Sequence, residues 1–238
     1  MTKKTTFAEQ VLQFNDDLSR ESFDLPNGFK IVNPYRGEEK EQVRKITTAF
    51  YKKYYNDDRP RRLILGSSPA RRGSAVTGVP FEDVEHLQSE TGIFIDNFYI
   101  NKSSSGFLYD VIREYGGCEK FYNDFYMNFV CSLGIVRTNS KGNEVNCNYY
   151  ENKKLKEALY PFMVSTIRSI IEFRIDTSVC YCIGSGENYS TLLEINEKYN
   201  FFDAIIPLEH PRFIMQYNSK NKDIFMKKYI SFLTNYNK

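Results

Sequence analysis

The 238-residue sequence contains no run approaching the roughly 20 apolar residues that a membrane-spanning helix needs. Its basic start, Met1 to Thr5, is not followed by an apolar segment, so we expect no signal peptide and a cytoplasmic protein. Low-complexity tracts and polar linkers are also missing. We therefore expect residues 1–238 to fold as a single domain.

Metal-binding patterns are missing as well. The five cysteines show no C-x-x-C spacing, and neither of the two histidines lies close to any of them. This argues against a zinc site or an iron–sulfur cluster and favours reduced, mostly buried thiols. We expect no bound metal.

Excess charge is scarce, with a formal net charge of only +2. Two stretches are nevertheless basic. Arg59–Phe81 holds five arginines and no acidic residue, and His210–Lys228 holds five Lys or Arg and one Asp. Contact with nucleic acid is one interpretation of these stretches, and solvated surface charge is the other.

The spacing of apolar residues predicts alternating helices and strands. Helices are predicted at 7–18, 38–55, 107–115, 153–173, 189–199 and 223–236, and strands at 29–32, 62–66, 125–136, 179–183 and 204–208. This alternation predicts an α/β fold, a three-layer α/β/α sandwich with a mainly parallel central sheet. Ligands bind such sheets beyond the carboxyl ends of the strands, where both basic stretches leave a strand.

The first of these loops has the sequence GSSPARRGSAVTGVPF and runs from Gly66 to Phe81. Its glycine spacing fits neither a Walker A loop nor a dinucleotide fingerprint. The loop offers a tight turn, backbone N–H groups and small side chains, and it ends in an aromatic ring. Core packing is the alternative role for Phe81.

The second loop begins with His210-Pro211-Arg212-Phe213. A histidine just past a buried strand can reach into a cleft at the sheet edge. A lone histidine is usually structural, but the loop context favours a functional role for His210 and not for His86. Gly184-Ser185-Gly186 is a third candidate, either a phosphate-binding turn of an unrelated nucleotide-binding enzyme or a simple strand-to-helix turn.

These loops resemble motifs of the uracil-DNA glycosylase superfamily. The first is similar to the Gly-x-Asn-Pro-Gly loop and following Thr-Gly-Val/Ile-Pro-Phe of the single-strand-selective monofunctional enzymes. The second, His-Pro-Arg-Phe-Ile-Met-Gln-Tyr, is similar to the His-Pro loop of a bacterial branch of that group. Asn33-Pro34-Tyr35-Arg36 and Asn148-Tyr149-Tyr150-Glu151 extend the resemblance over nearly the whole chain.

The resemblance implies an enzyme that flips uracil out of DNA and hydrolyses its N-glycosidic bond without a cofactor. Xanthine and other deaminated bases are further candidate substrates, in single- or double-stranded DNA. Neither motif contains lysine, which fits a monofunctional enzyme. A catalytically weakened module that binds damaged or abasic DNA is the alternative. We expect a monomer associated with the nucleoid through its substrate.

The resemblance also implies roles for individual residues. His210 would donate a hydrogen bond to the leaving base. Ser68 stands where the family has asparagine and would position the attacking water, with Glu82 or Asp83 as the alternative. Phe81 would stack on the base, in a pocket lined by Gly66, Ser67, Pro69 and Ala70.

Recognition of uracil in the family uses a side-chain amide, which can pair with both a carbonyl and an N–H group. Asn128 and Asn148 are the two candidates. A shift of one residue along the strand would turn Asn128 to the other face. The implied DNA contacts are Arg71, Arg72, Arg212 and Phe213.

Overall fold

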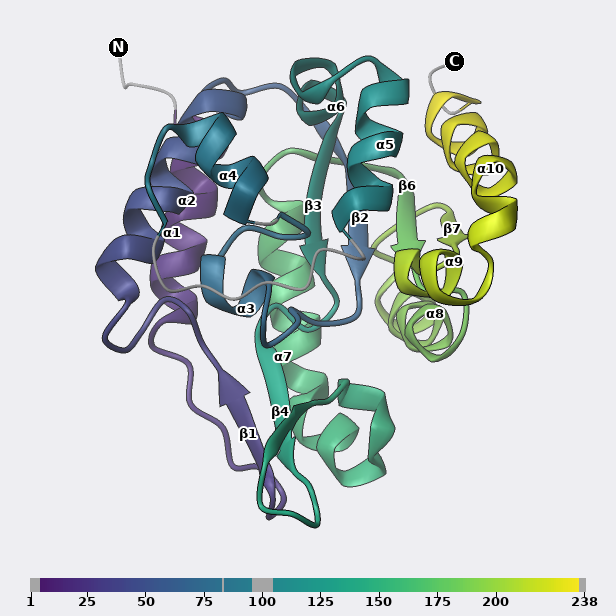
Figure 1. The fold of residues 1–238 in the computed structure, drawn as a ribbon. Coiled ribbons are helices and arrows are strands. Elements are labelled where there is room, and N and C mark those ends of the chain that lie inside the picture. The colour runs from purple at the N-terminus through teal and green to yellow at the C-terminus, as the bar shows by residue number, and fades with distance from the viewer. Residues whose placement is uncertain (1–4, 83, 96–104, 236–238) are drawn as a thin grey trace.

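The central feature of the fold is a parallel sheet with the strand order β3-β2-β6-β7. A computed structural model describes residues 5–82, 84–95 and 105–235 (Figure 1). The strands are β2 (Arg61–Gly66), β3 (Phe125–Phe129), β6 (Ile175–Ile183) and β7 (Ile205–Leu208). Every residue of β2 and β3 is buried, as expected for strands covered on both faces.

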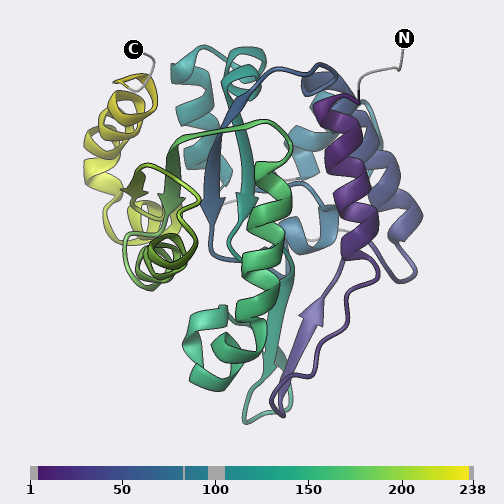
Figure 2. The ribbon, with the colours of Figure 1, turned by 180° about the vertical axis from the view of Figure 1, so that it is seen from behind.

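Helices cover both faces of this sheet, which confirms the predicted α/β class (Figures 1 and 2). One face carries α5 (Ser105–Tyr115), α6 (Cys118–Asp124) and α10 (Lys222–Asn235). The other carries α1 (Phe7–Leu18), α7 (Lys153–Ile171) and α8 (Glu187–Tyr199). Alternation along a strand assigns each side chain to a face. Phe125 contacts α5 and α6, whereas its neighbour Tyr126 contacts Phe7 of α1.

A second, antiparallel sheet projects beyond the main one, with the order β1-β4-β5 (Figure 1). It consists of β1 (Phe29–Val32), β4 (Gly134–Thr138) and β5 (Glu144–Asn146). The prediction of one strand at 125–136 is therefore wrong, because β3 and β4 belong to different sheets. Residues 125–136 are all buried, so their pattern carries no sign of the break.

The remaining elements are short or lie at the sheet edge. The predicted helix at 38–55 is α2 (Lys40–Tyr54), which packs beside α1. Elements that the periodicity did not predict are α6, β5, α3 (Ser74–Thr77), α4 (Val84–Thr91), α9 (Pro211–Tyr217) and the 3₁₀ turns η1 (Tyr149–Glu151) and η2 (Ser219–Asn221). Asp83, Ser103, Ser104 and Tyr236 lie outside the described residues. Within the described ranges, no helix has the length and apolarity to cross a membrane.

A buried arginine fixes the start of β2, the strand that leads into the first loop. Arg61 Nε donates to Tyr122 O at 2.7 Å, and Nη2 donates to Tyr54 O at 3.2 Å. The two terminal nitrogens bind the Asp57 carboxylate at 2.9 and 3.0 Å. The guanidinium also lies 4.9 Å from the Phe7 ring centroid. One side chain thus joins α1, α2 and α6 to β2.

Replacing this arginine is expected to destabilise the fold. Arg61→Met would remove the guanidinium that binds the Asp57 carboxylate and three main-chain carbonyls, and each buried acceptor left unsatisfied costs about 1–3 kcal/mol. Urea unfolding measures the change. Arg59→Met is the matched control, because Arg59 is exposed and its loss should change the free energy of unfolding by about 0.5 kcal/mol or less. Equal effects of both substitutions would contradict the assignment of Arg61 as the anchor.

Candidate active site

The two sequence motifs lie at the same edge of the parallel sheet, beyond the carboxyl ends of its strands. The first loop leaves β2 at Gly66, and His210 follows the end of β7. Between them, the end of β6 is tied to β7 by Gly184 N, which donates to Leu208 O at 2.8 Å. Figure 1 shows β2 and β3 pointing toward the side where α3 and α9 lie. The expected position of both loops at one edge is therefore confirmed.

Phe81 folds back onto the beginning of its own loop. A Cβ atom on Gly66 would lie 2.5 Å from Phe81 Cζ and 2.9 Å from Phe129 Cδ1. The Phe81 and Phe129 rings stack, with centroids 4.8 Å apart and an interplanar angle of 28°. Glycine is needed at position 66 because the two rings occupy the space of any side chain. The loop thus places a half-buried aromatic ring at the end of β2.

The backbone holds Phe81 in an unusual conformation. Its φ is 62°, in the left-handed region that costs non-glycine residues about 1–2 kcal/mol. Phe81 N donates to Ser74 Oγ at 2.9 Å, and Ser74 opens helix α3 inside the loop. Such strain persists where the surroundings determine the conformation, often at functional sites.

Asn128 lines a small pocket together with Phe129 and with Pro69, Ser74 and Pro80 of the first loop. Asn128 Nδ2 donates to Tyr126 Oη at 2.9 Å, and Oδ1 accepts from Phe129 N at 2.8 Å. The neighbouring Phe129 ring stacks on Phe81. Sequence reasoning missed Phe129, although the alternation of side chains along a strand could have indicated it as the neighbour of Asn128.

Asn148, far away in sequence, contacts the first loop directly. Its Oδ1 accepts hydrogen bonds from Ser67 Oγ at 2.9 Å and from Ser68 Oγ at 3.3 Å. Its Nδ2 donates to Glu151 Oε1 at 3.2 Å. The structure therefore brings Ser67, Ser68 and Asn148 together, and it adds Glu151, which the sequence indicated only as part of a resemblance.

Of the two carboxylates considered as alternatives to Ser68, Asp83 lies outside the described residues. Glu82 is buried and accepts a hydrogen bond from the Tyr122 hydroxyl, on α6. That interaction places it in the packing between α2 and α6. Pro69 is buried beside Ser68, Ala70 is exposed, and Arg71 N donates to Asn146 Oδ1 at 2.9 Å.

His210 caps the N-terminus of α9 through its imidazole. Nδ1 accepts from Arg212 N at 3.0 Å, and a main-chain N–H can only donate, so the ring proton belongs on Nε2. Burial, together with the positive charge of Arg212, lowers the pKa of His210 from 6.5 to about 4. At neutral pH the side chain is an uncharged imidazole with an Nε2–H donor that has no partner among the described residues.

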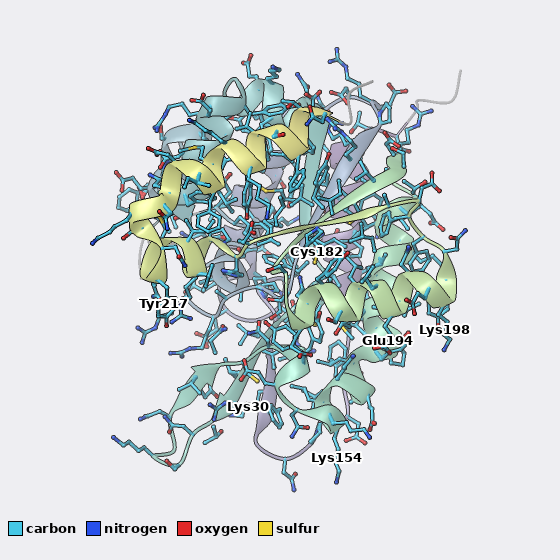
Figure 3. The ribbon with its side chains drawn as sticks, turned by 90° about the vertical axis from the view of Figure 1, so that its right-hand side faces the viewer. Lys30, Lys154, Cys182, Glu194, Lys198 and Tyr217 are labelled. Carbon is cyan, nitrogen blue, oxygen red and sulfur yellow. The ribbon has the colours of Figure 1, made fainter. Side chains whose placement is uncertain are left out.

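The side chains expected to contact DNA surround these loops. Arg72 and Arg212 are exposed, and Arg71 is half-buried. Phe213 and Tyr217 on α9 have exposed fractions of 46% and 76%. Figure 3 shows Tyr217 at the periphery of the molecule, a position that the sequence did not single out.

Within the described ranges, no group of three His, Cys, Asp or Glu side chains could hold a metal ion. All five cysteines are free, and four are buried, among them Cys182 in the interior (Figure 3). Burial raises the pKa of Cys131 to about 12. Gly184-Ser185-Gly186 forms the turn between β6 and α8.

Comparison with known proteins agrees with this arrangement. Residues 52–234 match the family model described as "Uracil DNA glycosylase superfamily", so the chain belongs to this superfamily. Among solved structures, it is similar to wild-type SMUG2 of Pedobacter heparinus, with 43% sequence identity and a TM-score of 0.92. The similarity covers 98% of this chain and 99% of that one. None of the curated proteins matches the chain.

These findings confirm the resemblance seen in the sequence. They support a repair function of the uracil-DNA glycosylase type. Such an enzyme is a hydrolase, and its substrate is DNA. The alternative of an unrelated nucleotide-binding enzyme is therefore dropped. The expected cytoplasmic location and the roles of individual residues stay predictions.

A side chain at position 66 is expected to disturb the aromatic pair. In Gly66→Ala, the new methyl group would force Phe81 or Phe129 to move, and such overpacking costs about 1–3 kcal/mol. Thermal unfolding measures the loss. Gly106→Ala is the control, because Gly106 lies in α5 with open space around it and should become slightly more stable. A Gly66→Ala protein as stable as wild type would contradict the close contact.

The lowered pKa of His210 predicts a stability change with pH. Between pH 6.5 and about 4, the unfolded chain binds a proton at this residue that the folded protein does not, so stability is lost as the pH falls through this window. His210→Asn keeps a capping side chain without titrating. Guanidinium unfolding at about pH 7 and about pH 4.5 should show a smaller loss in the variant than in wild type. Equal losses would show that the pKa is not lowered.

Proposed function

We propose that this protein is a monofunctional DNA glycosylase that removes uracil and leaves an abasic site. Its membership of the superfamily and its similarity to SMUG2 over nearly the whole chain support the reaction class. We further propose that residues 1–238 form a single domain, that the protein acts as a monomer without a cofactor, and that xanthine and other deaminated bases are additional substrates.

The observation that carries the proposal is the uncharged, capped imidazole of His210. As the N-glycosidic bond breaks, its electron pair moves onto the base, and negative charge develops on the base oxygen. A fixed donor aimed at that developing charge lowers the barrier. With Nδ1 engaged by Arg212 N, the Nε2–H group is the donor that His210 can offer. It needs no proton from solvent to act.

The aromatic ring at the end of β2 supports binding of a flipped base. A base that leaves the helix loses its stacking partners, and an aromatic side chain can restore stacking worth about 1–3 kcal/mol. We propose that the base stacks on Phe81, whose other neighbours are Gly66 and Phe129. We propose that Asn128, which lines a pocket with Phe129 and with Ser74 and Pro80 of the first loop, supplies the amide that reads the base, with Asn148 as the alternative.

The exposed side chains around the site support DNA binding. We propose that Arg71, Arg72 and Arg212 contact backbone phosphates, whose charge they complement. Phe213 directly follows the His-Pro-Arg segment and is partly exposed, so it suits filling the space that the flipped nucleotide leaves. Neither loop contains a lysine, so neither supplies the amine that a bifunctional enzyme uses for its Schiff base.

The direct test uses labelled oligonucleotides that carry one uracil, single- or double-stranded, followed by alkali cleavage of abasic sites. We expect strand breaks after alkali only. His210→Ala should lower the single-turnover rate by about 100- to 1,000-fold, the usual effect of losing one such donor. The other histidine supplies the control, because His86→Ala changes α4 and should leave the rate unchanged.

Two outcomes would contradict the proposal. The first is the absence of strand breaks with both the single- and the double-stranded uracil substrate. If tight binding to abasic DNA accompanied it, the damaged-DNA binding module would be favoured. The second is full activity of a folded His210→Ala protein.

A further inference from the structure

A chain of hydrogen bonds links an exposed carboxylate to the serine of the first loop. Glu151 Oε1 accepts from Asn148 Nδ2 at 3.2 Å and from Asn148 N at 2.8 Å. At the other end of the amide, Asn148 Oδ1 accepts from Ser67 Oγ and Ser68 Oγ. A carboxylate can bind only the NH₂ end of an amide, so Glu151 fixes the carbonyl end toward the serines.

This arrangement determines how Ser68 can meet a water molecule. A carbonyl oxygen has no proton to give, so Ser68 must spend its only hydroxyl proton on Asn148. The lone pairs of its oxygen remain, and they can only accept. A water molecule beside Ser68 therefore donates to it, which leaves the lone pairs of the water free to attack. If the hydroxyl were free to rotate, it could donate to the water and occupy the lone pair that attack requires.

Resting on the proposed glycosylase function, we propose that Asn148 and Glu151 are positioning residues that hold Ser68 as an acceptor for the attacking water. The negative charge of Glu151 polarises the chain, and hydrogen bonds to ionised groups are the stronger ones. Arg137 Nε lies 3.9 Å from Glu151 Oε2, at the outer end. The chain of polar contacts thus runs from Arg137 of β4 through Glu151 of η1 and its N-cap, Asn148, to Ser68 of the first loop.

The reaction balances without a base at this position. The water oxygen bonds to C1′ of the deoxyribose, the C1′–N bond breaks, and its electron pair leaves with the base. The former water then loses a proton to solvent, and the base anion takes a proton from solvent. Ser68 and Asn148 orient the water and do not remove its proton before attack, so their contribution is geometric.

Single-turnover kinetics on a uracil oligonucleotide test the proposal. Asn148→Ala should lower the rate by about 10- to 100-fold, the scale of a misplaced reactant. Its affinity for DNA with an uncleavable uracil analogue should change by less than about 3-fold. Glu151→Gln should lower the rate less than Asn148→Ala. Glu157→Gln is the matched control for it, because Glu157 is an exposed residue of α7 and should keep the wild-type rate.

A rescue variant separates positioning from a structural role or from reading of the base. In Asn148→Ala, the space beside Ser68 is empty, so Ser68→Asn can place an amide there. The double variant Ser68→Asn, Asn148→Ala should recover at least about a third of the wild-type rate, because the amide again offers an acceptor to the water. Neither a folding defect nor loss of a base contact would be rescued from position 68.

The outcomes are distinguishable. An active wild-type protein whose Asn148→Ala variant keeps the full rate overturns the inference but leaves the glycosylase proposal intact. So does a folded double variant that shows no rescue. Wild-type protein that is inactive on both single- and double-stranded uracil DNA overturns both.

Discussion

The active site depends on a missing side chain, that of Gly66, at the end of β2. Because no Cβ atom occupies that position, the Phe81 and Phe129 rings lie directly on the main chain. The first loop must then return to its starting point, and it does so through α3 and the hydrogen bond from Phe81 N to Ser74. The same turn presents Ser67 and Ser68 to Asn148. One close approach therefore sets the positions of both the aromatic ring and the polar groups.

Much of the fold could be predicted from the sequence because its elements are long and periodic. The helices α1 and α7 and the strand β2 follow from apolar spacing alone, although the predicted end of α7 at residue 173 lies two residues beyond the observed one. The small sheet could not be predicted, since it pairs β1 with β4 across more than a hundred residues. The turn between β3 and β4 is also hidden. A Cβ atom on Gly134 would lie 2.7 Å from Ala75 Cβ, so the requirement for glycine where β4 begins comes from another segment.

The site shows the same division between local and long-range information. The two loops are recognisable as sequence motifs, and the parallel sheet places both at one edge. The sequence does not settle which way a side chain points at the end of a strand. Asn128 and Phe129 are adjacent in β3, yet Asn128 donates to Tyr126 whereas Phe129 stacks on Phe81. The link from Ser68 to Asn148 spans 80 residues and has no local pattern. Only the folded chain brings these two residues together.

The two ends of the site have complementary hydrogen-bonding properties. In the proposed reaction, negative charge develops on the base and positive charge on the sugar, so a donor suits one end of the site and an acceptor the other. His210 is kept uncharged by burial and by Arg212, and its donor is ready at neutral pH without proton uptake. Ser68 is kept an acceptor by Asn148. Each group has its single proton fixed by a neighbour. The site thus settles the direction of its hydrogen bonds before substrate arrives, and none of that ordering has to occur during the reaction.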